Sequence, residues 1–144
     1  MNHLSRLWTT TLLTLLAAAL LAGCPSSSKQ SKTLDLTLQQ YEKAVRWSQW
    51  DVAANHIDPE YLVDNPITRL DMDRLRLFRV TQYNVRSSVG FDAGLGFQQV
   101  VEIRLFNRNR AVERTIIDQQ EWRYNADTER WNLHTGLPDV TQAR

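Results

Sequence analysis

Cysteine is almost missing from this chain of 144 residues, which contains only Cys24. A disulfide within the chain is therefore excluded. A metal site is not expected either, because His56 and His134 have no cysteine or second histidine at ligand spacing. Glycine and proline are scarce, with five and four residues, and neither a Gly-x-Ser-x-Gly motif nor a glycine-rich phosphate loop is present. The fold must depend on an ordinary apolar core, and no motif predicts catalysis or a cofactor.

A surplus of charge of one sign is also lacking. From Thr33 onward the chain has 14 basic and 16 acidic residues, whereas nucleic-acid-binding domains usually carry a basic surplus. The balance argues against a nucleic-acid partner. Arginines outnumber lysines 14 to 3 and are interspersed with acidic residues. We interpret them as a solvated surface with salt bridges rather than as an anion-binding patch.

Only one long apolar run is present, from Leu7 to Leu21, and threonines interrupt it. A membrane-spanning helix needs about 20 predominantly apolar residues. Arg6 precedes the run and the small residues Ala22 and Gly23 follow it, which is typical of a secretory signal over residues 1–23. The sequence Leu-Ala-Gly-Cys at 21–24 resembles a bacterial lipobox. The resemblance implies cleavage between Gly23 and Cys24 and acylation of Cys24 with fatty acids such as palmitate.

The same resemblance implies a small lipoprotein of a Gram-negative envelope. Several acyl chains on one cysteine hold a domain at a membrane almost permanently, at about 0.8 kcal/mol per buried CH₂. In many such lipoproteins an Asp after the cysteine retains the protein at the inner membrane. Pro25 stands there in this chain, which favours the periplasmic face of the outer membrane over the inner membrane. The following residues, 25–32, include no apolar side chain except proline, and we expect them to form a flexible tether.

Residues 33–144 are predicted to form one domain that begins with two helices. Apolar residues recur at helical spacing in one stripe, which consists of Leu34, Leu38, Tyr41 and Val45. Ser48 followed by Asp51 resembles a capping box for a second, short helix, which Asp58-Pro59 should end. Its buried face is predicted to contain Trp50, Ala53 or Ala54, and Ile57.

Beyond the turn at Asn65-Pro66, apolar residues alternate as in strands. The alternation changes phase between Val80 and Tyr83, which predicts a bulge near Thr81-Gln82. Further strands are predicted over 101–105, 112–124 and 131–133, separated by short polar turns. Sequential strands joined by short turns pair as an antiparallel meander, and helices cover one face. The fold class is therefore α+β, with two N-terminal helices packed on a curved, mostly antiparallel four-stranded sheet.

This order of a long helix, a short tryptophan-rich helix, bulged strands and hairpins over 33–136 resembles the NTF2-like (cystatin-like) cone. The resemblance implies a pocket between helix and sheet, where some members, such as ketosteroid isomerase and scytalone dehydratase, move protons. Candidate pocket residues are Tyr41, Tyr61, Asp118, Trp122 and His134. Asp118 shares the phase of Ile116 and Trp122, but a phase change at Ile116-Ile117 would expose it to solvent, and we favour the exposed position. Core positions are favoured for Trp47, Trp50, Trp122 and Trp131.

Three functions fit these features. The first, which we favour, is a non-enzymatic interaction module that is held at the membrane by its lipid and docks an envelope protein. The second is a small-ligand binder that uses the interior of the cone. The third is an isomerase- or dehydratase-like enzyme, which requires Asp118 or His134 in a pocket opposite a tyrosine hydroxyl.

Overall fold

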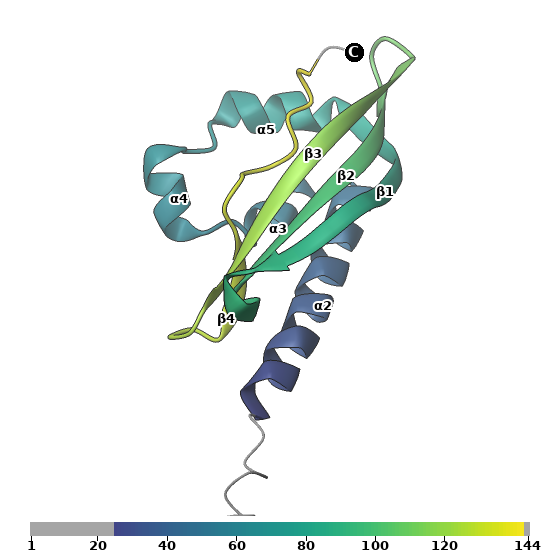
Figure 1. Cartoon of the computed structure of the whole chain (residues 1–144). Helices are drawn as coiled ribbons and strands as arrows, with labels where there is room; N and C mark the ends of the chain where they lie inside the picture. Colours follow the sequence, from purple (N-terminus) through teal and green to yellow (C-terminus); the bar gives the residue numbers. More distant parts are fainter. Residues whose placement is uncertain (1–24, 143–144) are drawn as a thin grey trace, which may run out of the picture.

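A computed structural model describes residues 25–142, in which four helices precede a four-stranded sheet (Figure 1). The helices are α2 (Pro25–Arg46), α3 (Trp50–Ala54), α4 (Pro59–Asp64) and α5 (Arg69–Arg76). The α+β class is confirmed. The signal segment and the lipobox with Cys24 lie outside the described residues. Within the part of the chain that is described, no helix is long and apolar enough to cross a membrane.

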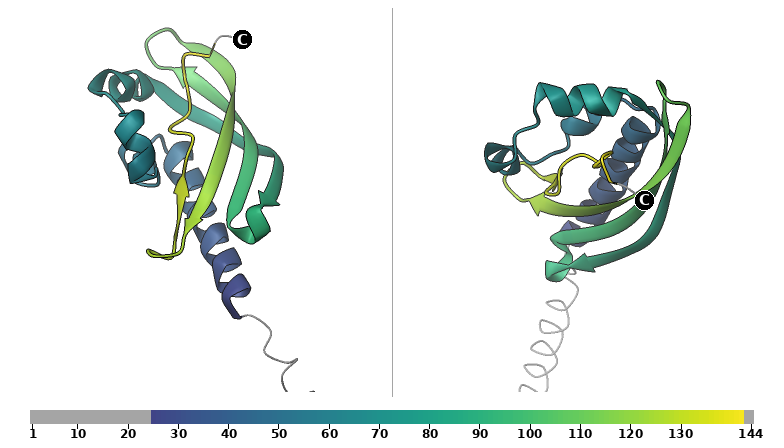
Figure 2. Two further views of the ribbon diagram at one scale, coloured as in Figure 1. Left: turned by 60° about the vertical axis from the view of Figure 1, so that its left-hand side comes forward. Right: turned by 90° about the horizontal axis from the view of Figure 1, so that it is seen from above.

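The strands β1 (Phe78–Phe91), β2 (Gly96–Asn107), β3 (Val112–Asn125) and β4 (Arg130–Leu133) form an open antiparallel sheet in sequential order. The predicted meander is therefore confirmed. The register of β1 on β2 shifts between Val80 and Gln82, where the bulge was expected, and shifts again between Val85 and Ser87. Bulges bend and twist a strand, and Figure 2 shows the sheet curving around α2.

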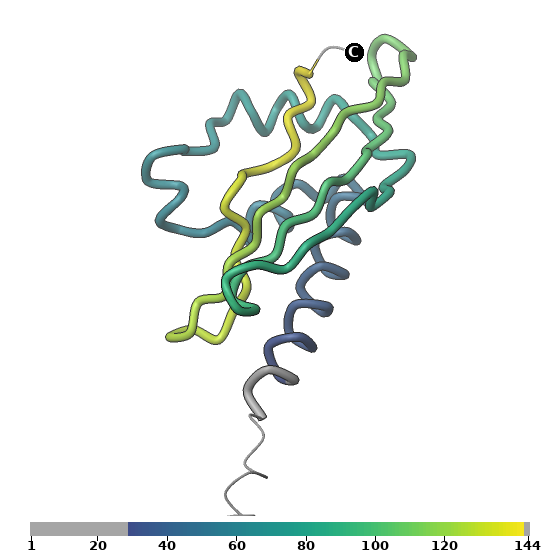
Figure 3. The backbone as a smooth tube through the Cα atoms, in the orientation of Figure 1, coloured from purple at the N-terminus to yellow at the C-terminus, as the bar shows by residue number. Residues whose placement is uncertain are grey.

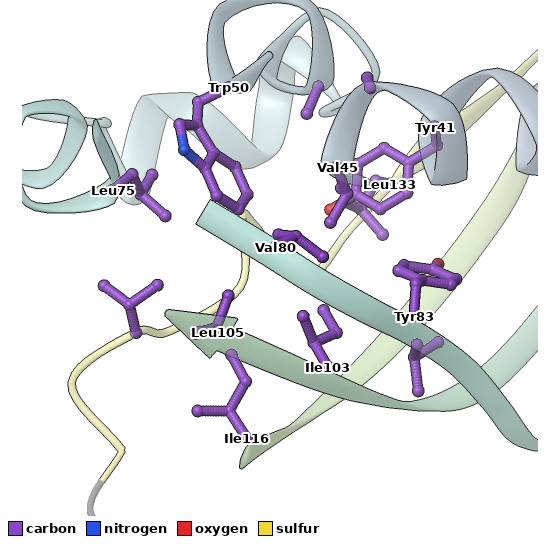
Figure 4. Packing of buried hydrophobic residues seen from close by; sticks show 14 of the residues in the cluster. Tyr41, Val45, Trp50, Leu75, Val80, Tyr83, Ile103, Leu105, Ile116 and Leu133 are labelled. Atoms are coloured by element: carbon purple, nitrogen blue, oxygen red, sulfur yellow. The ribbon is translucent and has the colours of Figure 1, made fainter. Parts of the chain in front are cut away.

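The core lies between the concave face of this sheet and the helices. Val101, Ile103 and Leu105 of β2 are completely buried and alternate with more exposed residues, as predicted. Tyr41 and Val45 of the predicted helical stripe face them from α2, and Leu34 and Leu38 are partly buried. Trp50 closes the core between α3 and the start of β1 (Figure 4).

The residues expected to form a flexible tether are helical instead. α2 begins at Pro25 and includes residues 25–32. Proline is well suited to the first turn of a helix, where its missing N–H leaves no hydrogen bond unmade. A residue far along the sequence also contacts this part of α2, because the Nζ of Lys29 lies 2.6 Å from Oε2 of Glu129.

The structure has four helices before the sheet rather than two. α3 ends at Ala54, and Asp58-Pro59 begins α4 instead of ending α3. The Asp58 carboxylate accepts hydrogen bonds from the backbone N–H of Glu60 at 2.7 Å and of Tyr61 at 3.3 Å. An aspartate followed by proline thus stabilises a helix start, and the sequence alone was interpreted as a helix end.

Helix capping also explains two further differences between the predicted and the observed helices. Thr68 and Asp71 form the reciprocal capping box of α5, a helix that was not predicted from the sequence. The capping box expected at Ser48 and Asp51 is absent, because α3 has no side-chain cap. Ser48 instead has a positive φ of 54°, and its Oγ accepts a hydrogen bond from the N–H of Val80 at 3.0 Å.

The C-terminal segment of the domain follows β3 (Figure 3). The N–H of His134 donates to the carbonyl of Glu121 at 2.8 Å, and Arg114 donates to the carbonyl of Val140 at 2.9 Å. Leu133 also pairs with Ile57 in an isolated parallel bridge. These contacts hold the C-terminal segment against β3 and join β4 to the segment between α3 and α4.

Candidate functional site

Three of the five predicted pocket residues meet inside the domain. Tyr41 projects from α2 and its ring lies edge-on to that of Trp122 on β3, with 5.1 Å between ring centroids. Asp118 is also inside, with 8% of its surface exposed, so the solvent-exposed position that we favoured is wrong. The reason is that β3 keeps strict alternation through Ile116, Asp118 and Trp122 and has no phase change at Ile116-Ile117.

Asp118 belongs to a buried polar cluster centred on Gln120, which we call the Gln120 cluster: Tyr83, Gln99, Asp118 and Gln120. The Nε2 of Gln120 donates to Oδ2 of Asp118 at 2.6 Å and to the hydroxyl of Tyr83 at 3.1 Å. Its Oε1 accepts from Nε2 of Gln99 at 2.6 Å. Sequence reasoning missed both glutamines, although they occupy inward positions of β2 and β3.

The protonation states in this interior are set mainly by burial. Burial raises the pKa of Asp118 to about 6, and the hydrogen bond from Gln120 offsets only part of that effect. Burial also raises the pKa of Tyr41 well above its usual value, with a further contribution from the charge of Asp118. The hydroxyl of Tyr41 has no hydrogen-bond partner among the described residues. The interior therefore holds two neutral phenols and one carboxyl group that titrates near pH 6.

The Gln120 cluster is largely buried, and none of its four side chains is more than 8% exposed. Tyr41 and Trp122 above it are completely buried, and Gln120 is almost so. His56 adds an edge-on contact with the ring of Tyr41, at 5.7 Å between centroids. Burial lowers the pKa of His56, which favours its neutral form. A perturbed carboxyl group beside tyrosines is a feature of many active sites, but only 8% of the surface of Asp118 is exposed.

Tyr61 and His134 lie elsewhere, so the five residues do not form one pocket. Tyr61 lines a surface groove of about 380 Å³ between α4, α5 and residues 135–141. The Nε2 of His134 lies 3.2 Å from Oδ2 of Asp58, and this carboxylate also caps α4 and accepts from Nδ2 of Asn132 at 3.2 Å. The Asp58–His134 contact holds β4 against α4, which is a structural role. Among residues 25–142, no group of His, Cys, Asp or Glu side chains is arranged to hold a metal ion.

The surface contains a feature that the sequence did not predict. Trp47 was expected in the core with Trp50, Trp122 and Trp131, but 72% of its surface is exposed, whereas the other three are buried. α2 ends at Arg46 and the left-handed backbone at Ser48 turns the chain, so Trp47 projects outward. With Arg46, it lines a groove of about 390 Å³ that reaches Val80 and Thr81 of β1.

This groove lies at the outer edge of the sheet. β1 pairs with β2 on one side only, so its other side is unpaired among the described strands. Val85 and Val89 of β1 are about half exposed. An open strand edge presents backbone N–H and C=O groups that another chain can pair with. Trp47 and the free edge of β1 together form what we call the β1-edge surface.

Comparisons with known proteins bear on the fold alone. No protein-family model and no curated protein matches the chain. Among solved structures, the chain is similar to a SEC-C motif containing protein from Rhodopseudomonas palustris, known from a solution structure. The TM-score is 0.54 with 15% sequence identity, over 70% of this chain and 74% of that one. At this identity the likeness supports a shared α+β architecture and carries nothing about activity.

Proposed function

We propose that this chain is a lipid-anchored envelope protein whose domain docks another protein and catalyses no reaction. In this proposal Cys24 carries the acyl chains, and the domain lies on the periplasmic side of the outer membrane. The support for the anchor is the sequence at residues 21–24. The support for docking is the contrast between a largely buried interior and an exposed tryptophan beside a strand edge that is unpaired among the described strands.

The β1-edge surface is the observation that carries the docking proposal. Tryptophan is enriched where proteins bind one another, because it buries a large area at low entropic cost. The N–H of Val80 already donates to Ser48, so a partner segment in extended conformation would add to β1 beyond Val80 through backbone hydrogen bonds. It would place an apolar side chain against Trp47. Strand addition of this kind is a common mode of peptide recognition.

The geometry of α2 suits this role. Its 22 residues make a helix about 33 Å long, which begins directly after Cys24 and ends next to Trp47. Trp47 and the start of β1 therefore lie at the far end of α2 from the proposed anchor, and the rest of the β1 edge runs back along the helix (Figure 1). A partner in the periplasm would reach this surface without contacting the lipid headgroups.

An NTF2-like cone that acts on a small ligand is the second candidate. The curved sheet around α2 supports the cone, and the titrating Asp118 near the hydroxyls of Tyr41 and Tyr83 supports acid–base chemistry. The burial of all three side chains disfavours this candidate. An isomerase or dehydratase would need the helices to move away from the sheet to admit a substrate.

Crosslinking in cells tests the docking proposal. Benzoylphenylalanine, a photo-reactive amino acid that keeps a large aromatic group at this position, replaces Trp47 in the full lipidated chain. A second variant carries it at Val63 of α4, a position that is 79% exposed. We expect one discrete crosslinked product from position 47 and none from position 63. Cys24→Ser should abolish lipidation, so that the precursor stays uncut or the chain fails to partition into detergent. A chain that crosslinks to nothing from position 47, in membranes where it is lipidated, contradicts the proposal.

A further inference from the structure

Eight of the 14 arginines gather at one end of the domain. They lie in two segments, 69–79 and 104–114, which contain only three acidic residues, Asp71, Asp73 and Glu113. The segments are neighbours, because Phe78 pairs with Asn107 and the N–H of Arg108 donates to the carbonyl of Leu77 at 2.9 Å. We call this surface the arginine end; its arginines are Arg69, Arg74, Arg76, Arg79, Arg104, Arg108, Arg110 and Arg114.

Only half of these arginines have carboxylate partners. Arg69, Arg74 and Arg76 lie within 4 Å of aspartates, and Arg104 lies 3.0 Å from Glu113. No carboxylate within residues 25–142 lies within 4 Å of the other four, which are Arg79, Arg108, Arg110 and Arg114. The prediction that the arginines form salt bridges on the surface therefore holds for four of the eight arginines of the arginine end. The other half carries uncompensated positive charge, although the domain as a whole has an acidic surplus.

A groove of about 410 Å³ crosses the arginine end. Arg74, Arg110 and Arg114 line it, together with the apolar side chains of Leu77, Phe78 and Val140, and no acidic residue is among its lining. Arg114 is fixed in place, because its guanidinium lies 5.0 Å above the ring of Phe78 and donates to the carbonyl of Val140 at 2.9 Å. Asp139 and Asp71 line the adjoining groove beside Tyr61 instead.

We propose that the arginine end binds an acidic segment of a partner protein. Carboxylates of that segment pair with Arg108, Arg110 and Arg114, because the planar guanidinium donates two parallel hydrogen bonds to a carboxylate. An apolar side chain of the segment lies against Leu77, which is 39% exposed. The proposal rests on the docking function above, and it supplies the chemistry of the partner.

Two observations favour a peptide over a phosphate group or a lipid headgroup. The groove combines arginines with an apolar floor, which fits a segment of mixed acidic and apolar residues better than a bare anion. The arginine end also lies opposite the start of α2, since α5 and the β2–β3 turn occupy the other end of the domain (Figure 1).

Binding of a labelled peptide tests this inference with the full lipidated chain in detergent. The probe is a pool of fluorescent eight-residue peptides in which Glu or Asp alternates with Leu or Val, and the control pool replaces the acids with Gln and Asn. We expect saturable binding of the acidic pool only, weakened at least tenfold by raising NaCl from 50 to 300 mM. The variant carrying Arg108→Gln and Arg110→Gln should bind at least tenfold more weakly.

The matched control is Arg130→Gln, which removes an exposed arginine at the start of β4 that also has no carboxylate within 4 Å among residues 25–142. We expect it to bind like the unaltered chain. Failure of the acidic pool to bind, or equal binding by the double variant, overturns the inference. Tighter binding of inorganic phosphate, anionic vesicles or a single-stranded oligonucleotide at the same salt concentration overturns it as well. Crosslinking from position 47 would still stand in those cases, so the two proposals fail separately.

Discussion

The indole nitrogen of Trp131 donates a hydrogen bond to the backbone carbonyl of Gln30 at 3.2 Å, across 101 residues of sequence. This contact joins β4 to the part of α2 nearest Cys24. The ion pair of Lys29 with Glu129 lies beside it. The helix next to the proposed lipid is therefore part of the folded domain and not a loose connection.

Trp131→Phe should release this part of α2. The variant loses a hydrogen bond worth about 1 kcal/mol, so amide hydrogens near residues 30–36 should exchange faster with solvent. Hydrogen exchange measured by mass spectrometry on this segment checks the effect. Lys29→Gln removes only the exposed ion pair, which is usually worth less than about 1 kcal/mol, and should change exchange little. Unaltered exchange in Trp131→Phe would show that α2 is held without the indole.

The two buried tyrosines should respond oppositely to loss of their hydroxyls. Tyr41→Phe removes a buried hydroxyl without a partner among the described residues, so it should leave the free energy of unfolding unchanged or raise it by about 1 kcal/mol. Tyr83→Phe breaks contacts with Gln120 and Gln99 and should lower it by about 1–2 kcal/mol. Urea denaturation of both variants decides between these outcomes. A large loss in Tyr41→Phe would mean that its hydroxyl has a partner.

Asp118 should make the domain less stable as the pH rises. Its pKa is about 6 in the folded state and near 4 in an unfolded chain. Between these values the folded protein holds more protons than the unfolded one, so the free energy of unfolding falls with rising pH, by about 3 kcal/mol in total. Asp118→Asn should remove this dependence and be more stable than the unaltered chain at pH 7, while the two should be similar at pH 4.

Denaturant titrations at several pH values measure that difference. The pKa of Glu121 is lowered, mainly by a hydrogen bond from Arg123, and its effect on stability has the opposite sign. Because Glu121 is present in both proteins, its contribution cancels in the comparison. Parallel stability curves for the two proteins from pH 4 to pH 7 would contradict the burial of a titrating Asp118.

Trp47 and Trp50 are separated by two residues, and their substitution should have very different effects. Trp50 is 1% exposed, so Trp50→Ala should cost about 3–5 kcal/mol of stability. Trp47→Ala should change stability by less than about 0.5 kcal/mol but abolish co-purification of the partner from solubilised membranes. A Trp47→Ala protein that unfolds easily would place the indole in the core after all. Intact co-purification would remove Trp47 from the docking surface.

Strand order and the bulge of β1 were predictable because they depend on local alternation. The phase change between Val80 and Tyr83 is visible in the sequence, and so are the buried positions Val101, Ile103 and Leu105. The long helix was equally clear from its apolar stripe. In these elements, apolar residues recur with the period of the strand or helix that buries them, so their spacing indicates the secondary structure.

The helices α4 and α5 and the exposure of Trp47 were not predictable in the same way. α4 and α5 have only six and eight residues, too few for an apolar period to be recognised, and the capping side chains of Asp58 and Thr68 define where they begin. Trp47 depends on the backbone turn at Ser48, whose positive φ is unusual for serine. The Gln120 cluster was missed because glutamines at inward strand positions look like solvent-facing residues until the partners on neighbouring strands are known. The arginine end forms only when β1 and β2 pair.

The parallel bridge between Ile57 and Leu133 has a consequence for how the chain acquires its structure. The N–H of Leu133 donates to His56, and the N–H of Asp58 donates to Leu133, so the last strand inserts beside the segment that links α3 and α4. The three hairpins of the sheet join residues that are close in sequence, so they can form early. This junction brings together residues 76 positions apart, so its formation costs more loop-closure entropy. If the chain emerges N-terminus first into its compartment, the junction cannot form until residue 133 has arrived. A chain truncated before β4 should then form compact helices that lack the contacts with Leu133, and proteases should cleave it readily.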